Sequence, residues 1–126
     1  MTKTAIRKRV EFWKNKLGLT NWDILITFKP TNYPKATEAF TGIAKTDCQS
    51  TYKLATMIFD PKQLRWVDDK VIIHELLHCL FSSLTGFARA NFDYKKYNKS
   101  DNWLEYFEEQ VVSEIERIIH RIDKKK

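Results

Sequence analysis

The chain has 126 residues, a formal net charge of +6, and 43% hydrophobic and 13% aromatic residues. A chain of this size buries one modest core, so we predict a single domain spanning residues 1–126. The sequence shows neither a run of about 20 apolar residues nor a hydrophobic stretch after Met1, so we expect a cytoplasmic protein without a membrane span or signal peptide.

The first elements are a helix and a strand. Apolar residues recur at helical spacing over residues 4–17, which predicts an amphipathic helix, and Gly18 is typical of the position just after a helix. Apolar and polar residues then alternate from Trp22 to Phe28, which predicts a strand bounded by Pro30.

Two further strands are predicted before the middle of the chain. The pattern from about Phe40 to Gln49 indicates a second strand, with Gly42 offering a bend or bulge. Residues 52–59 indicate a third, which ends at Asp60 and Pro61. Because only a short polar segment separates the second and third strands, we expect them to form an antiparallel hairpin.

The second half of the sequence is mainly helical. After a short helical turn, we predict a helix over about residues 67–84 that ends near Gly86. Residues 87–101 show no periodicity and are interpreted as a loop or lid, and a last helix follows over residues 100–122. We therefore predict an α+β fold in which three helices pack on a small, three- to four-stranded, mainly antiparallel sheet.

The middle helix contains the motif on which the functional interpretation depends. His74 and His78 are two of the three histidines, and they lie in an otherwise apolar segment. On a helix they lie one turn apart on one face and can bind a single metal ion. Glu75 lies about 100° around the helix from His74, within reach of a water on that metal. We favour a metal site over two ordinary core histidines.

A catalytic zinc site normally has three protein ligands, so a further ligand is needed. Glu108 is the favoured candidate because it falls within the apolar stripe of the last helix, where a carboxylate is costly unless it is paired, protonated or bound to metal. The alternatives are Glu109, to one side of the stripe, His120, and residues of the 87–101 loop. An ion pair with a buried Lys or Arg would explain Glu108 without a metal.

Together, His74–His78 and the later segment Glu108–Ile115 resemble the small gluzincin-type zinc metallopeptidases. The similarity is greatest to the minimal, single-domain minigluzincin-like forms of prokaryotic and phage proteins, and Trp22–Ile26 and Ala55–Asp60 are similar to their sheet. The resemblance implies a zincin-like fold with a C-terminal glutamate helix and zinc as the cofactor. It also implies the residue roles: ligands His74, His78 and Glu108, and general base and acid Glu75.

One position departs from the pattern of the larger gluzincins. Those proteins carry an Asp four residues after the third ligand, where it braces a histidine, whereas here that position is Val112. Support for the histidines must therefore be built differently. The residue that steadies the oxyanion is also unassigned, with Tyr94, Tyr97 and His120 as candidates.

The resemblance predicts a zinc-dependent endopeptidase that acts on a protein or peptide substrate and is held latent by its own loop or tail. Residues 54–58, as an exposed sheet edge, would hold the substrate by backbone hydrogen bonds. One alternative is a regulatory, SprT-like or ImmA-like member that associates with nucleic acid, as the charge of +6 suggests. Another is a non-catalytic module with structural histidines. No membrane partner is expected, and the oligomeric state does not follow from the sequence.

The cysteines are expected to be reduced. Cys48 and Cys79 lie far apart in the sequence and form no Cys-x-x-Cys pair, so they predict neither a disulfide framework nor a thiolate metal site. Because a helix turns Cys79 away from His78, we interpret it as a small core residue.

Overall fold

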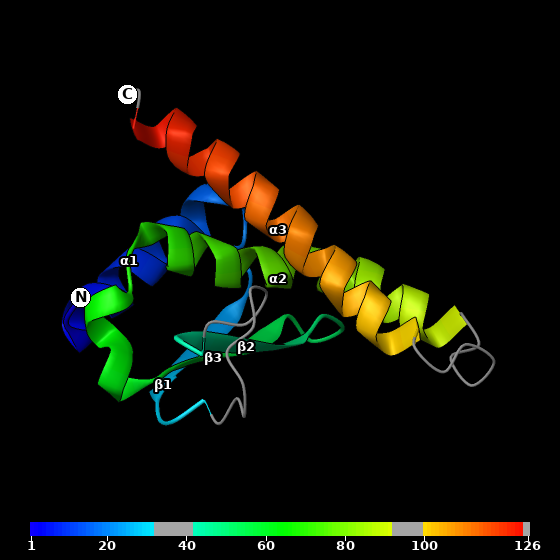
Figure 1. Ribbon diagram of the computed structural model, residues 1–126, viewed down its shortest axis with the longest axis horizontal. Coiled ribbons are helices and arrows are strands. Elements are labelled where there is room, and N and C mark those ends of the chain that lie inside the picture. The colour runs from blue at the N-terminus through cyan, green and yellow to red at the C-terminus, as the bar shows by residue number, and fades with distance from the viewer. Residues whose placement is uncertain (32–41, 92–99, 125–126) are drawn as a thin grey trace.

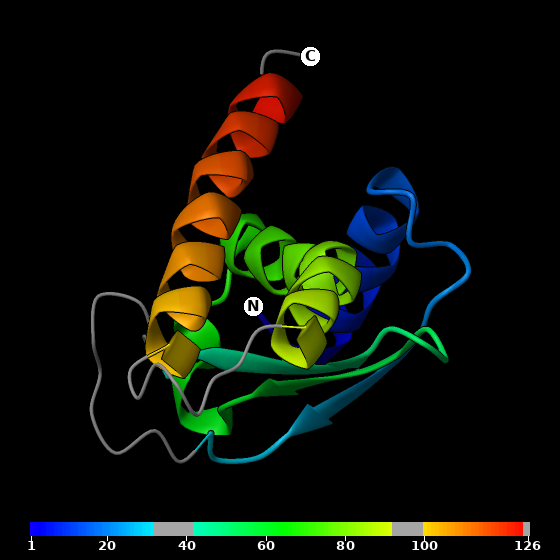
Figure 2. The same ribbon diagram turned by 90° about the vertical axis from the view of Figure 1, so that its right-hand side faces the viewer.

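The computed structural model describes residues 1–31, 42–91 and 100–124, in which the helices lie on one face of a small sheet (Figures 1 and 2). The second helix, α2, lies between α1 and α3 (Figure 2). In chain order the elements are α1 (Lys3–Lys16), β1 (Asp23–Phe28), β2 (Ala44–Gln49), β3 (Leu54–Phe59), the 3-10 helix η1 (Pro61–Trp66), α2 (Asp69–Asn91) and α3 (Ser100–Lys124).

Helix α1 is closed at both ends by local contacts. The hydroxyl of Thr2 accepts a hydrogen bond from the backbone N–H of Ala5 (3.1 Å), which satisfies one free donor of the first turn. Gly18 follows the helix with a φ of +77°, a conformation that glycine adopts without strain. The predicted helix and its end are thus confirmed, and its buried face consists of Ile6, Val10 and Trp13.

The sheet has the order β1-β3-β2, with β3 in the centre. Strands β2 and β3 form the predicted antiparallel hairpin, whereas β1 pairs with β3 in parallel. The sheet is therefore mixed, and the prediction of a mainly antiparallel sheet was wrong. The prediction that β3 is an exposed edge was wrong too, because alternation identifies a strand but not its neighbours.

The core lies between the sheet and the helices. The central strand contributes Met57 and Phe59, both with no exposed side-chain surface, and α2 contributes Ile72 and Leu76. The remaining members come from α1, from the segments after α1 and η1, and from β3, α2 and α3, so every layer shares one cluster: Ile6, Val10, Trp13, Leu19, Trp22, Ala55, Val67, Ile73, Leu77, Cys79 and Val112.

Helix α2 is longer than the sequence suggested. It starts where Asp68 accepts a hydrogen bond from the N–H of Val71 (3.1 Å), and η1 precedes it as expected. It continues through Gly86 to Asn91, so the predicted end was wrong. A glycine inside a helix costs only about 1 kcal/mol, and the good helix formers that follow it outweigh this cost. Of the predicted loop, residues 92–99 lie outside the described residues.

Helix α3 has the predicted position, but its buried face differs from the one we expected. Phe107, Val112 and Ile118 belong to the predicted apolar stripe. Val112 is fully buried, as predicted, but Phe107 and Ile118 have exposed fractions of 58% and 53%, whereas Glu109 beside the stripe is 8% exposed. The buried face is thus shifted from the centre of the apolar stripe toward Glu109, although it still includes Val112. This shift decides which carboxylate faces α2.

Candidate metal centre

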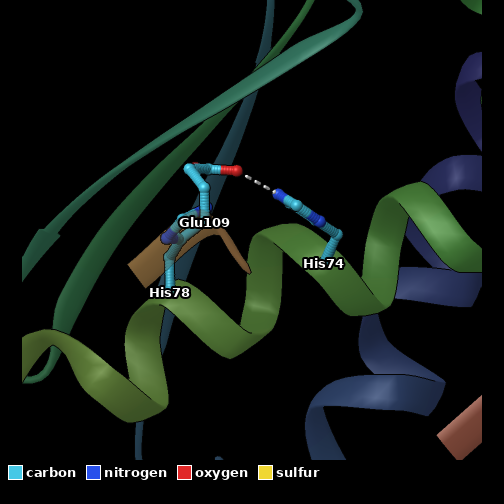
Figure 3. A group of neighbouring side chains, drawn as sticks. All are labelled: His74, His78 and Glu109. Atoms are coloured by element: carbon cyan, nitrogen blue, oxygen red, sulfur yellow. Dashed lines mark hydrogen bonds and ion pairs between the residues drawn. The ribbon is translucent and has the colours of Figure 1, made fainter. Parts of the chain in front are cut away.

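His74 and His78 lie one turn apart on the side of α2 that faces α3, as the motif predicts (Figure 3). Their ring centroids are 5.2 Å apart. Glu109 projects toward them from α3 (Figure 3). One ligand atom from each of these three side chains lies within 4.8 Å of the others. The group is compact enough to surround one ion after small side-chain movements.

The carboxylate of Glu109 contacts both imidazoles. Its Oε2 lies 2.8 Å from His74 Nε2, and its Oε1 lies 2.8 Å from His78 Nε2. Glu108, the carboxylate that the sequence favoured as third ligand, does not occupy this position. The reason is the shift of the buried face of α3, which directs Glu109 into the interface between the helices.

Glu108 and a third glutamate lie on the far sides of the imidazoles. Glu108 Oε1 lies 3.0 Å from His78 Nδ1, and Glu116 Oε2 lies 3.8 Å from His74 Nδ1. Each imidazole therefore has an outer carboxylate near Nδ1, and metal-binding histidines commonly have such a partner on the nitrogen that does not bind the metal. Sequence reasoning missed Glu116, although it lies two helical turns after Glu109 on the same face, which was the available signal.

The charges in this interface reinforce one another. Burial alone would lower the pKa of His74, but hydrogen bonds with Glu109 and Glu116 outweigh burial and raise the pKa to about 9. For His78, burial is likewise outweighed by hydrogen bonds with Glu108 and Glu109, which raise its pKa to about 10. Burial would raise the pKa of Glu109, yet the two imidazoles lower it to about 2. Without a metal, the two imidazoliums and Glu109 form a part-buried ion cluster.

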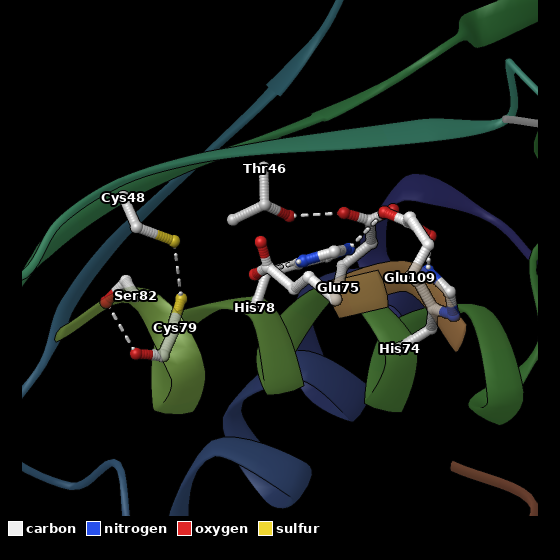
Figure 4. Close-up of polar contacts among 9 residues, drawn as sticks. Thr46, Cys48, His74, Glu75, His78, Cys79, Ser82 and Glu109 are labelled. Carbon is white, nitrogen blue, oxygen red and sulfur yellow. Dashed lines mark hydrogen bonds and ion pairs between the residues drawn. The ribbon is translucent and has the colours of Figure 1, made fainter. Parts of the chain in front are cut away.

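Glu75 lies beside this group and under the edge strand β2 (Figure 4). The side chain is buried, and Thr46 Oγ1 donates a hydrogen bond to its Oε2 (2.6 Å). Burial raises the pKa of Glu75, while His78 and the Thr46 hydrogen bond act in the opposite direction. Sequence reasoning also missed Thr46, because nothing in the sequence reveals which strand covers the motif helix.

The other sequence candidates do not join the cluster. His120 lies outside the group of potential ligands and close enough to Asp69 to help lower the pKa of that carboxyl. Tyr94 and Tyr97, named as possible oxyanion groups, lie outside the described residues.

The donors fit a zinc ion. Two imidazole nitrogens and one carboxylate are a common ligand set of catalytic zinc, in which a water molecule takes the fourth position. Each imidazole presents Nε2 to the shared centre and Nδ1 to an outer carboxylate, from Glu116 or Glu108. This orientation fixes which nitrogen is available to the metal.

Comparison with protein-family models, with curated proteins and with solved structures finds no match. Among the described helices, none combines the length and the apolar character that crossing a membrane requires. The functional interpretation therefore depends on the geometry and chemistry of the site itself.

Proposed function

We propose that the protein is a zincin-like, zinc-dependent peptidase in which His74, His78 and Glu109 hold the metal. The observation that carries the proposal is the position of the Glu109 carboxylate, 2.8 Å from Nε2 of each histidine, with Glu75 beside the group. Even a part-buried cluster of ionisable groups is costly to desolvate, and a metal ion would compensate this cost. Perturbed pKa values in such a cluster are typical of functional sites.

The reaction requires a proton acceptor near the attacking water. A bound zinc ion would supply a water of lowered pKa and polarise the carbonyl of the scissile peptide bond. Glu75 would be the residue that takes the proton of that water and returns it to the leaving amine. Among the described contacts Thr46 engages Oε2 of Glu75, so Oε1 is assigned to this proton transfer. Burial, which raises the pKa of Glu75, favours its action as the acid in the second step.

The edge strand β2 is the proposed site of substrate binding, in place of the central strand β3. In the described part of the chain, β2 pairs only with β3, so its other side offers backbone donors and acceptors. An extended peptide can add to such an edge as a further strand. Since Thr46 of β2 contacts Glu75, a peptide bound along β2 would lie beside the catalytic carboxylate.

The test is the substitution Glu75→Gln. Glutamine keeps the size of the side chain and can still accept the Thr46 hydrogen bond, but it cannot act as a base. We expect unchanged zinc content and a loss of peptide cleavage on the order of 100-fold or more, measured with a denatured protein substrate. The matched control is Glu114→Gln on the exposed side of α3. Unchanged cleavage in Glu75→Gln would refute the assignment.

A second candidate follows from the same contacts. Glu109 pairs with both histidines directly, so the interface is satisfied without a metal, as in a non-catalytic module with structural histidines. Under that alternative, one equivalent of zinc leaves the unfolding temperature unchanged. Under the proposed function, bound zinc raises the unfolding temperature because it binds only the folded chain.

A further inference from the structure

Strand β2 contacts helix α2 at two successive positions (Figure 4). The first contact is the hydrogen bond from Thr46 to Glu75, and the second joins the sulfur atoms of Cys48 and Cys79, which lie 3.3 Å apart. The step from Thr46 to Cys48 covers about 6.7 Å along the strand, and the step from Glu75 to Cys79 covers about 6 Å along the helix. The two lengths match, so both contacts form when β2 lies alongside α2. The cysteines are therefore held together by the fold.

The two thiols differ in accessibility. Cys48 is half-buried on the edge strand, whereas Cys79 is 1% exposed in the core. A disulfide has a bond length of about 2.05 Å, so the sulfurs need to approach by about 1.3 Å, which small side-chain rotations can provide. Cysteine pairs with one accessible thiol and a second thiol beside it are typical of redox-sensitive sites.

We propose that Cys48 and Cys79 form a redox-active dithiol whose disulfide ties β2 to α2 beside the candidate metal centre. With a peroxide as the oxidant, the accessible Cys48 sulfur attacks one peroxide oxygen, breaks the O–O bond and becomes a sulfenic acid, and one water leaves. The Cys79 thiol then attacks the Cys48 sulfur, forming the S–S bond and breaking the S–O bond. The displaced hydroxide takes the proton of Cys79 and leaves as a second water.

The disulfide would act on the fold and on the neighbouring contact. It links residues 31 positions apart in the sequence and so restricts the unfolded chain. It also fixes the strand that carries Thr46 at the distance at which Thr46 reaches Glu75. Oxidation would thus add a covalent tie between β2 and α2 to the Thr46–Glu75 hydrogen bond, which the reduced chain already forms. The cross-link itself requires no metal, so it is independent of the proposed function.

The experiment treats the full chain with hydrogen peroxide in slight excess and maps its cysteines by mass spectrometry without reduction. We expect a cross-linked peptide pair containing Cys48 and Cys79, a mass lower by two hydrogens, and a rise of about 10 °C in the unfolding temperature. Dithiothreitol should reverse all three changes. Cys48→Ser and Cys79→Ser should show neither the cross-link nor the stabilisation.

Three outcomes would overturn the proposal. One is oxidation of Cys48 to sulfinic or sulfonic acid without a cross-link, and another is a disulfide between two chains. The third is full alkylation of both thiols, without denaturant, after peroxide treatment. Because these results are read on the wild-type chain, a folding defect in either serine variant does not affect them.

Discussion

The two sides of helix α2 are packed in opposite ways. Toward the hydrophobic core, α2 presents fully buried aliphatic side chains such as Ile72 and Leu76. Toward α3 it presents His74 and His78, whose partners are three carboxylates. The apolar side is stabilised by burial of surface from water, which needs no exact partner. The charged side depends on a few specific contacts, because each buried charge is costly without its partner.

This difference indicates that the two sides of α2 have different roles. The apolar side sets the position of α2 and accounts for much of the stability. The charged side lowers this stability because it holds a cluster of charged groups that can take part in chemistry, as functional sites commonly do. Substitutions on the two sides should therefore differ in their main effect: one set changes mainly the free energy of unfolding, and the other changes mainly metal binding.

The largest effect on stability is expected from a cavity in the apolar core. Ile6→Ala removes a side chain with no exposed surface, and we expect the free energy of unfolding to fall by about 2–5 kcal/mol. Its matched control, Ile118→Ala, truncates a side chain that is 53% exposed and should change this value by about 0.5 kcal/mol or less. Urea denaturation measures both, and equal losses would contradict the burial pattern.

On the charged side, the two neighbouring glutamates should differ in their effect on zinc. Glu109→Gln removes the carboxylate between the imidazoles, and we expect zinc affinity to fall by more than about 100-fold. Glu108→Gln removes only an outer contact to His78, and we expect this change to lower zinc affinity by about 10- to 100-fold. Competition with a chromophoric chelator measures both, and a larger loss for Glu108→Gln would restore the ligand set predicted from the sequence.

Zinc binding should also depend on pH. The pKa values of about 9 and 10 for His74 and His78 lie above the ordinary value near 6.5. In the metal-free protein, their ion pairs therefore stabilise the fold fully below about pH 6.5 and are lost as the pH rises through 9 and 10. At pH 7 zinc must displace about two protons. Calorimetry in buffers of different ionisation enthalpy counts them, and zinc binding without proton release would contradict the cluster.

The smallest effect is expected from an ion pair at the rim of the apolar side. Arg9 donates to both oxygens of Asp69 at 2.9 and 2.6 Å, and this hydrogen bonding lowers the pKa of Asp69. Both side chains are partly exposed, so Asp69→Asn should cost about 1 kcal/mol or less. A carboxyl group whose pKa is lowered by folding stabilises the folded state at pH values above its ordinary pKa near 4. This contribution is lost as the pH falls through the lowered pKa. The difference between variant and wild type should thus shrink at pH 3, and a constant difference would argue against the ion pair.

Much of the fold was predictable because it follows from local patterns. The helix over residues 3–16 and the β2–β3 hairpin follow from periodicity and turn residues, and the pairing of His74 with His78 follows from helix geometry alone. The parallel pairing of β1 with β3 was not predictable, because strand order depends on how the layers pack.

The third carboxylate shows why the rest of the site was not predictable. The apolar stripe of α3 predicted that Glu108 faces inward, but the side chains of Phe107 and Ile118 on that stripe are 58% and 53% exposed. The buried face of α3 carries Glu109 and Glu116, which reach the histidines, next to the fully buried Val112. A pattern based on hydrophobicity does not predict a buried helix face that carries charged residues.

The central claim is that His74, His78 and Glu109 hold one zinc ion, and native mass spectrometry of the full chain tests it most directly. After addition of equimolar zinc and removal of the excess, we expect about one zinc per wild-type chain and none retained by Glu109→Ala. The exposed-site variant Glu114→Ala should retain zinc like the wild type. A wild-type chain that retains no zinc would contradict the account.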